Sequence, residues 1–406
     1  TTNAAGASNT AIGQNALTTN SSGTQNTAVG RNALDANTTA SDNTAVGFDA
    51  LSATTTGYIN VAIGKNAMVA NTTGQGNVAI GGLALDANTT GAANVAIGCA
   101  AMSSNTTCGY NIGIGFCALT TQVDGGVNNT AVGSYSMKLN TTGDLNVGIG
   151  FHAMGSNTTA GANVAVGAYA MCCNTQGGDN VAVGYAAMYN NTTGTNSVAV
   201  GCLALCTHTT GSSNTAVGLQ ALKTTSTGVN NSSVGGNSLK LNTIGGNNTA
   251  VGKDSLENNT EGCCNVGIGY NGGSLTITGD NNTSLGYDAQ PSSNSVSNEI
   301  TLGNGAHNNL RCADTSISTL SDERDKENIE DIPLGLDYIN AIRPVKFDWN
   351  ARDGSRVGKK DFGFIAQELD KVEEKFGLKE YTRLVSKENP EKWEADPMKT
   401  YPILIK

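Results

Sequence analysis

The stretch "NTAVGRNALDANTTASD", residues 26–42, decides the fold because the chain repeats it. Sixteen of the seventeen intervals between equivalent motif glycines are 17 residues, and one is 18. Such a period is too short for a helical repeat or a propeller blade, and it suits one coil of a β-solenoid stacked on the next. The sequence therefore predicts a mainly β protein with a parallel β-solenoid or β-roll over residues 1–305. Its 18 units end their N-[TV]-A-[VI]-G motif at Gly13, Gly30, Gly47, Gly64, Gly81, Gly98, Gly115, Gly133, Gly150, Gly167, Gly184, Gly201, Gly218, Gly235, Gly252, Gly269, Gly286 and Gly303.

Each unit alternates large and small residues before its glycine. The residue before the glycine is Val, Ile or Leu, the one two earlier is usually Val, Ile or Thr, and a small residue lies between them. This period of two predicts a short strand, and we expect the larger side chains to point into the coil. The small residues would then form a flat outer face that another surface can approach closely. A second apolar pair, as at Ala33-Leu34, is assigned to the other inward side.

A polar corner follows the apolar pair. The "NTTG" at Asn71–Gly74 supplies Asn and Gly for tight turns with positive φ, and Thr for a short exposed strand. Asn also begins the motif in 16 of 18 units, with Ser197 and Glu299 as the exceptions, so stacked Asn side chains are expected to bond their neighbours above and below. The repeated Asn and Thr side chains suit hydrogen bonds to a sugar, but turn formation and solvation explain them more simply.

The predicted rod is thin. At about 4.8 Å per coil it would be roughly 80 Å long, and a 17-residue coil encloses little apolar volume. An isolated solenoid so poor in large side chains would be marginally stable. We therefore predict that identical chains associate laterally through the small-residue face.

The repeat resembles the head repeats of trimeric autotransporter adhesins, whose N-S-V-A-I-G units form a left-handed parallel β-roll. It is also similar to repeats of viral and phage fibres. The resemblance covers about residues 1–303, and the unit here is longer than the adhesin unit. It implies that the associated chains form a homotrimer.

The bulk composition argues against several classes of protein. A net charge of −10 without basic clusters argues against nucleic acid or an anionic membrane as a direct partner. No apolar run is long enough for membrane insertion, and the first residues contain neither Met nor a signal-like core, which predicts a fragment or a processed chain. The ten cysteines contain no paired C-x-x-C motif, so we predict no metal and no cofactor. We expect mostly free, buried thiols in a chain made in a reducing cytoplasm.

The charge density changes at Ser321. Residues 1–320 carry 7 Lys or Arg and 14 Asp or Glu, whereas residues 321–406 carry 16 and 19. We assign residues 306–320 to a neck and residues 321–406 to a compact α+β domain. Its predicted elements are a helix in "PLGLDYINAIR" between Pro333 and Pro344, strands in "VKFDW" and "DFGFIA", and an amphipathic helix in "QELDKVEEKFG" ended by Gly377.

Four stretches of this domain carry a second resemblance: "SDERDKENI" from Ser321, "GLDYINAIRPVKFDW" from Gly335, "FGFIAQEL" from Phe362 and "YPILIK" from Tyr401. Together they resemble the intramolecular chaperone domain that ends endosialidase-type phage tail spikes and many other trimeric fibres. The resemblance implies a module that helps three chains register and fold and then cuts itself off. Family members normally continue into a long C-terminal helix, whereas this sequence stops at Lys406, so we expect a domain that is truncated or lacks that helix.

The resemblance also implies site residues. Ser321 is the nucleophile, Lys326 is the base, and the bond between Leu320 and Ser321 breaks in a single event without turnover. A serine hydroxyl next to its own preceding carbonyl needs only deprotonation and strain to attack it, and Ser–Lys pairs are a known nucleophile–base combination. Lys326 must be neutral to accept the proton, so burial or nearby Arg324 must depress its pKa. The alternative is a solvated charged turn with Ser321 as a helix cap.

These features predict a trimeric fibre of a phage or other virus, located on the virion outside the cell and made in the host cytoplasm. Its rod would present a surface for host attachment, with a host glycan or protein as receptor and other fibre or tail proteins at the N-terminus. One alternative is a bacterial surface adhesin, which would require a membrane-anchoring β-barrel. Another is a polysaccharide-degrading tail spike, which needs paired carboxylates, and Asp254 with Glu257 and Glu261 is the nearest candidate.

Overall fold

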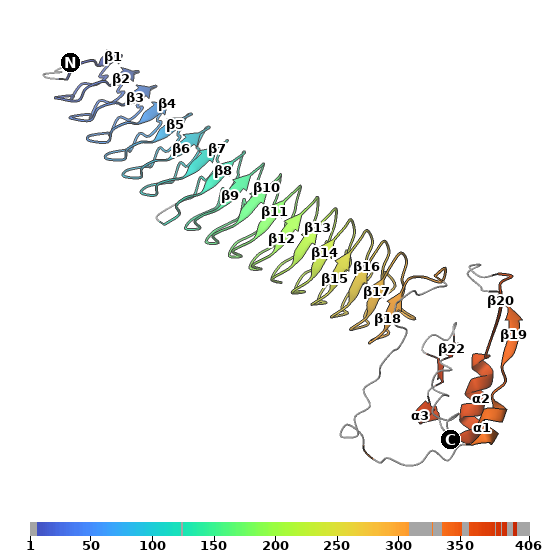
Figure 1. The fold of residues 1–406 in the computed structure, drawn as a ribbon. Coiled ribbons are helices and arrows are strands. Elements are labelled where there is room, and N and C mark those ends of the chain that lie inside the picture. The colour runs from blue at the N-terminus through green and yellow to red at the C-terminus, as the bar shows by residue number, and fades with distance from the viewer. Residues whose placement is uncertain are drawn as a thin grey trace.

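A computed structural model describes residues 6–122, 125–307, 327, 335–350, 357–377, 379–382, 384–387 and 393–395. Within residues 6–307 the chain forms a rod of stacked coils, each with one short strand (Figure 1). The strands are β1 (Thr10–Ile12), β2 (Thr27–Val29), β3 (Thr44–Val46), β4 (Val61–Ile63), β5 (Val78–Ile80), β6 (Val95–Ile97), β7 (Ile112–Ile114), β8 (Thr130–Val132), β9 (Val147–Ile149), β10 (Val164–Val166), β11 (Val181–Val183), β12 (Val198–Val200), β13 (Thr215–Val217), β14 (Ser232–Val234), β15 (Thr249–Val251), β16 (Val266–Ile268), β17 (Thr283–Leu285) and β18 (Ile300–Leu302).

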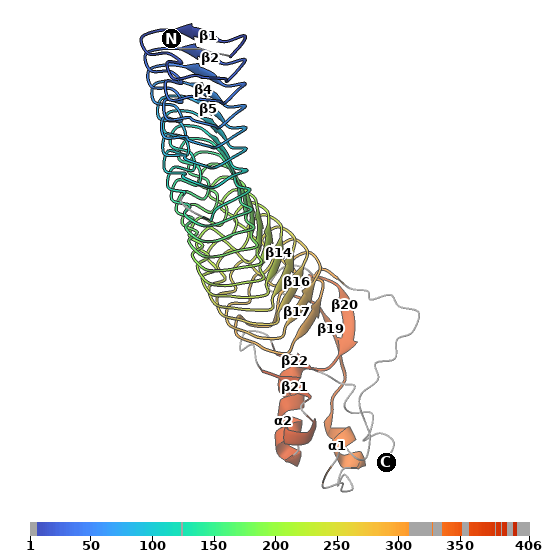
Figure 2. The ribbon, with the colours of Figure 1, turned by 90° about the vertical axis from the view of Figure 1, so that its left-hand side faces the viewer.

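Each strand of the rod pairs in parallel with the strand of the next coil, so one continuous sheet runs along the stack (Figure 2). The register follows the repeat: Thr10 pairs with Thr27, and Ala28 with Ala45. The parallel β-solenoid with a 17-residue period is therefore confirmed.

The longer interval lies between β7 and β8, where Ile112 pairs with Thr130. Gln122 occupies the position of the corner Asn in this coil, and its side-chain amide donates to the carbonyl of Gly126, four residues on. In the regular coils the Asn side chain reaches the carbonyl three residues on, as from Asn37 to Ala40. The longer Gln side chain thus compensates for the extra residue of the turn.

The core of the rod is a column of small residues with one large side chain per coil. The central Ala of the strand, as at Ala28, and the Ala of the second apolar pair, as at Ala33, are buried. The expected inward position of the second pair is confirmed. Its Leu and Met residues stack through the rod as Leu17, Leu34, Leu51, Met68, Leu85, Met102, Leu119, Met137, Met154, Met171, Met188, Leu205, Leu222, Leu239 and Leu256.

The predicted orientation of the strand is wrong. The small central residue points into the coil, and the larger residues on either side of it are partly or fully exposed, as in β12 where Val200 is 36% exposed. The interior is too narrow for the reverse arrangement, because a Cβ built on Gly113, at the central strand position, would lie 2.7 Å from Cγ of Met102. The flat outer face therefore consists of Val, Ile and Thr, and the small-residue face is internal.

The positive-φ positions also differ from expectation. The motif glycines bend the chain, as at Gly81 with φ +135°, a backbone that few other residues adopt. Gly74 of the "NTTG" corner does not have a positive φ. A glycine is required there because the next coil lies too close for a side chain: a Cβ on residue 74 would lie 2.6 Å from the carbonyl oxygen of Gly91. The Thr residues of this corner form no strand, and the Thr72 hydroxyl donates to the carbonyl of Thr89 at 3.1 Å.

The C-terminal elements are α1 (Leu336–Ala341), β19 (Val345–Asp348), β20 (Lys360–Gly363), α2 (Ala366–Phe376), α3 (Lys379–Thr382), β21 (Val385–Ser386) and β22 (Glu394–Ala395). β19 and β20 pair antiparallel, as do β21 and β22. The two predicted helices and two predicted strands are present, and Gly377 ends α2 with φ +67° as expected. None of the described helices is long and apolar enough to span a bilayer.

Candidate functional sites

An aliphatic column runs along the outside of the rod, on the strand face. Its members are the residues before the motif glycines, and every unit contributes Val, Ile or Leu. Side chains at this position are 36% exposed in Val200, 38% in Ile268 and 46% in Leu285. An exposed apolar strip of this length is typical of an interaction surface. The members are Ile12, Val29, Val46, Ile63, Ile80, Ile97, Ile114, Val132, Ile149, Val166, Val183, Val200, Val217, Val234, Val251, Ile268, Leu285 and Leu302.

The Asn residues that begin the motif form a buried strand ladder. The backbone N–H of Asn77 donates to Oδ1 of Asn60 at 3.0 Å, and Oδ1 of Asn77 accepts the N–H of Asn94 at 2.9 Å. The side-chain amide of Asn77 also donates to the carbonyl of Gly91 at 2.8 Å. The expected bonding between stacked Asn side chains is confirmed. Because these side chains are buried, a receptor cannot contact them.

Both exceptions in the strand ladder keep its hydrogen bonds to neighbouring coils, although neither has an amide to donate to the corner carbonyl. The Ser197 hydroxyl accepts the N–H of Asn214 at 3.2 Å, as an Asn would. Glu299 donates its N–H to Asn282, and its carboxylate accepts both the N–H and the hydroxyl of Ser292, at 2.8 and 2.6 Å. The Glu299 carboxylate therefore bonds within its own coil, and within the described residues the strand ladder ends at this position.

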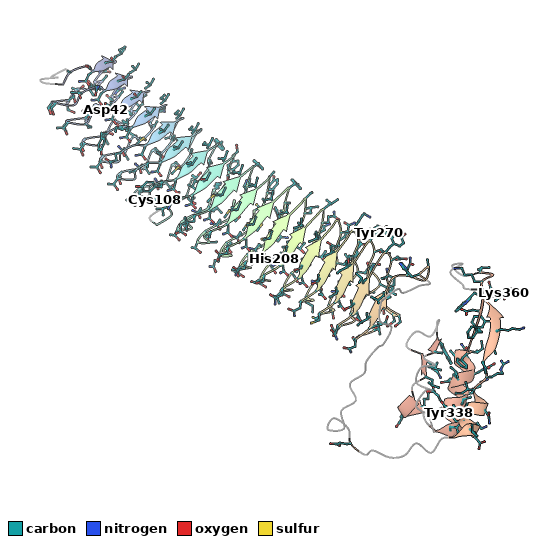
Figure 3. The ribbon with its side chains drawn as sticks, viewed as in Figure 1. Asp42, Cys108, His208, Tyr270, Tyr338 and Lys360 are labelled. Atoms are coloured by element: carbon teal, nitrogen blue, oxygen red, sulfur yellow. The ribbon has the colours of Figure 1, made fainter. Side chains whose placement is uncertain are left out.

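The Asn residues of the "NTTG" corner form a second, corner ladder that the sequence did not reveal. Asn191 donates to Asn174 at 2.8 Å, and Asn174 donates to Asn157 at 2.9 Å. All three side chains are fully buried, so the simple interpretation of these residues as solvated turn formers is wrong. His208 continues the ladder inside the rod (Figure 3).

His208 is buried and uncharged in this ladder. Its Nδ1 lies 3.0 Å from Oδ1 of Asn191 and donates to it, and its Nε2 accepts from the side-chain amide of Asn214 at 3.3 Å. Burial lowers the pKa of His208 to about 4, because the charged form would lose its hydration. A neutral imidazole can thus replace the amide of Asn.

Of the three acidic residues that the sequence offered for sugar hydrolysis, Asp254 and Glu257 are paired with lysines, and Glu261 is exposed. Lys253 bonds Asp254 at 2.5 Å, and Lys240 bonds Glu257 at 3.3 Å. Burial acts to raise the pKa of Asp254, but hydrogen bonds from Lys253 and Asn237 outweigh it and hold that pKa below its ordinary value. A glycosidase general acid needs a raised pKa, so this cluster does not favour hydrolysis.

The nine cysteines within the described residues are free, as expected. Only Cys108 and Cys172 among them are buried, so the expectation of mostly buried thiols is wrong. Burial and the adjacent Cys173 raise the pKa of Cys172 to about 11, which makes this thiol a poor nucleophile at neutral pH. In the described part of the chain, no group of three or more His, Cys, Asp or Glu side chains lies close enough to hold a metal ion.

The C-terminal elements pack around Tyr338 of α1, which is fully buried with Leu384 (Figure 3). The Tyr338 ring meets Phe376 of α2 edge to face, with centroids 5.2 Å apart. The Glu373 carboxylate is buried on α2 and accepts the N–H of Leu384 at 2.6 Å. These contacts join α1, α2 and the start of β21 into one small core.

Ion pairs support the same core from outside. Asp370 of α2 lies 2.6 Å from the amine of Lys387 and 2.9 Å from that of Lys379, and the hydrogen bond from Lys387 is the main reason why the pKa of Asp370 is lowered. Arg343, after α1, makes two hydrogen bonds to the carboxylate of Glu368. Leu320, Ser321 and Lys326, the predicted cleavage residues, lie outside the described residues, as does the predicted helix start at Pro333.

Residues 321–378 match the sequence model of a protein family described as "Chaperone of endosialidase". The match begins at Ser321 and takes in α1, β19, β20 and α2. No curated protein matches the chain, and no solved structure does. The chain thus combines a parallel β-solenoid rod with a C-terminal segment of the endosialidase-chaperone type.

Proposed function

We propose that this chain is a homotrimeric fibre protein of a phage or other virus, whose rod serves host attachment. The observation that carries the proposal is the aliphatic column, which faces outward in every coil of the rod. The interface differs from the one that the sequence suggested, because the face that three chains can share consists of Val, Ile and Thr and not of small residues.

The dimensions of the strand face suit a stable interface. Three strand residues at about 3.3 Å each, over a rod of roughly 80 Å, give a face of about 800 Å² per chain. A specific protein–protein interface buries about 800 Å² on each partner. A rod-long contact between chains would therefore bury enough apolar area to stabilise these thin coils.

Such an interface also needs help with registration. Every coil presents nearly the same side chains, so chains shifted by one coil make almost the same apolar contacts, and the rod alone specifies its register weakly. A C-terminal segment of the endosialidase-chaperone type supplies a non-repeating structure at which three chains can align. This requirement supports a chaperone function for residues 321–406.

Self-cleavage completes the proposal. Ser321 Oγ attacks the carbonyl carbon of Leu320 while Lys326 takes the hydroxyl proton, and an ester to Oγ forms as the peptide bond before Ser321 breaks and Lys326 returns the proton to the Ser321 nitrogen. Water then hydrolyses this ester, which restores the serine hydroxyl, leaves a carboxylate on Leu320 and separates the rod from its chaperone. The matched family and the S-D-x-R-x-K motif support this assignment. The boundary at Ser321 between neck and tail has the same support.

The oligomeric state tests the central claim. Val183→Lys with Val200→Lys places charges on the aliphatic column, whereas Thr193→Lys with Thr210→Lys adds the same charges at exposed corner positions. Sedimentation should show a trimer for the wild type and the corner variant, and smaller species for the column variant. A monomeric wild type would refute the proposal, as would a column variant that stays trimeric.

A further inference from the structure

A strip of aromatic rings crosses five successive coils in the middle of the rod. The ring centroids of Phe116 and Tyr135 are 5.3 Å apart, those of Tyr135 and Phe151 are 6.1 Å apart, those of Phe151 and Tyr169 are 5.3 Å apart, and those of Tyr169 and Tyr185 are 6.2 Å apart. All four contacts are edge to face. We call these five residues the aromatic strip, and its four coil steps extend over roughly 20 Å.

The strip follows from an alternation that only these coils show. Phe116, Phe151 and Tyr185 directly follow motif glycines, whereas the intervening coils have Ser134 and Ala168 there. In the intervening coils the next residue, Tyr135 or Tyr169, supplies the ring. The rings therefore zigzag between two neighbouring columns and form an unbroken line.

The aromatic residues of the strip destabilise the folded rod at the positions that they occupy. Tyr135 and Tyr169 have φ +59°, a conformation in which Asn is favoured over bulky residues, and Asn66 and Asn237 occupy this position in other coils. Phe116 and Tyr185 remain 45% and 56% exposed. Strained residues and exposed aromatic residues that join in one line across a few coils indicate a binding function.

The strip is not needed for contact between chains along the rod. A contact along the whole rod needs a repeat position that is apolar in every coil, as it is in the aliphatic column. The two repeat positions that form the aromatic strip do not meet this requirement, because other coils have Asn, Lys, Gly or Cys there, as at Asn66 and Lys65. The strip is also only one or two side chains wide. A partner that is itself a narrow line fits it better than a folded protein surface.

We propose that the aromatic strip binds an extended, neutral oligosaccharide, which would be the receptor class of the attachment function proposed above. The C–H faces of sugar rings would stack on the exposed rings of Phe116, Phe151 and Tyr185, and the tyrosine hydroxyls would bond sugar hydroxyl groups. His152 adds a further polar ring beside the exposed ones, since it stacks on Tyr135 and on Tyr169, with centroids 5.1 and 6.0 Å apart. The Lys138 amine already lies over the Tyr135 ring, 5.3 Å from its centroid.

The test uses residues that the repeat already accommodates. Phe151→Ala with Tyr169→Asn replaces two rings of the strip by residue types that other coils carry at the same positions, such as Ala168 and Asn66. The matched control is Phe48→Ala with Leu83→Asn, which introduces the same two residue types at the same repeat positions outside the strip. The full-length proteins are titrated with a panel of linear neutral and acidic oligosaccharides of several rings, and their sedimentation is recorded.

At least one neutral oligosaccharide should bind the wild type and the control equally, and bind the strip variant at least about tenfold more weakly. Absence of binding by every neutral oligosaccharide, binding of acidic ones alone, or equal binding by the strip variant overturns the inference. A strip variant that loses its trimer also overturns it, because the strip would then belong to the contact between chains. An intact wild-type trimer that binds no sugar refutes the inference and leaves the proposed fibre unaffected.

Discussion

His208 Nδ1 lies 3.0 Å from Oδ1 of Asn191, so a histidine continues a buried ladder built of asparagines. The other ring nitrogen faces the side-chain amide of Asn214. Both contacts require the neutral ring, since a protonated Nε2 would point its hydrogen at another donor. His208 is therefore a buried group of the rod that can titrate in mild acid.

Acid should weaken the rod through His208. Its pKa is about 4 in the folded chain, against 6.5 ordinarily, so the unfolded chain binds the proton first as pH falls. Neutral His208 makes its full contribution to the free energy of unfolding above pH 6.5. This contribution decreases by about 3 kcal/mol as the pH falls towards 4. Chemical denaturation between these pH values measures it. His208→Asn, which restores the usual residue, should remove this part of the pH dependence, and equal slopes in both proteins would contradict the prediction.

The strand ladder should be sensitive to loss of a single amide. Asn77→Ala removes the side chain that bonds Asn60, Gly91 and Asn94, and it leaves the buried N–H of Asn94 without its acceptor. We expect a loss of about 3 kcal/mol or more in the free energy of unfolding. Asn77→Ser is the control, because Ser197 shows that a hydroxyl preserves the contact to the next coil. Equal denaturation midpoints for the Ala and Ser variants would contradict the role of the ladder.

Two adjacent glycines should respond differently to the same substitution. Gly81 has φ +135°, and a Cβ there would lie 2.5 Å from the carbonyl oxygen of Gly98 in the next coil. Gly81→Ala is therefore expected to cost more than about 3 kcal/mol. Gly82→Ala should be nearly neutral, since its Cβ would meet nothing closer than 3.9 Å. Thermal unfolding compares the two variants, and similar midpoints would show that the coils can separate to admit a methyl group.

The cleavage proposal predicts a change in chain length. The wild type should lose its 86-residue tail, residues 321–406, on a denaturing gel, whereas Ser321→Ala and Lys326→Ala should remain intact because each lacks one partner of the Ser–Lys pair. Lys346→Ala, on β19, is a control that should still be cut. The proposal fails if the wild type stays whole or if all variants are cut equally.

Much of the fold was predictable because repetition constrains it strongly. A fixed period of 17 residues sets the parallel register, so Thr10 must pair with Thr27 once the coils stack. The C-terminal helix α2 was equally visible, since its amphipathic pattern ends at Gly377. The corner ladder was missed because Asn followed by Thr and Gly is typical of exposed turns, and nothing in Asn191 itself shows that it is buried.

The sequence by itself determined the solenoid, its number of coils and its register, because these follow from periodicity alone. Only the tertiary structure decided which face of each strand is internal. Alternation has a period of two, so a shift of one residue exchanges the faces without changing the pattern. The deciding factor is the width of the coil, which already holds one Leu or Met, such as Met102, and leaves room beside it only for Gly, Ala or another small residue. The Val and Ile side chains are consequently excluded to the surface, where they form the face that we assign to the other chains of the fibre.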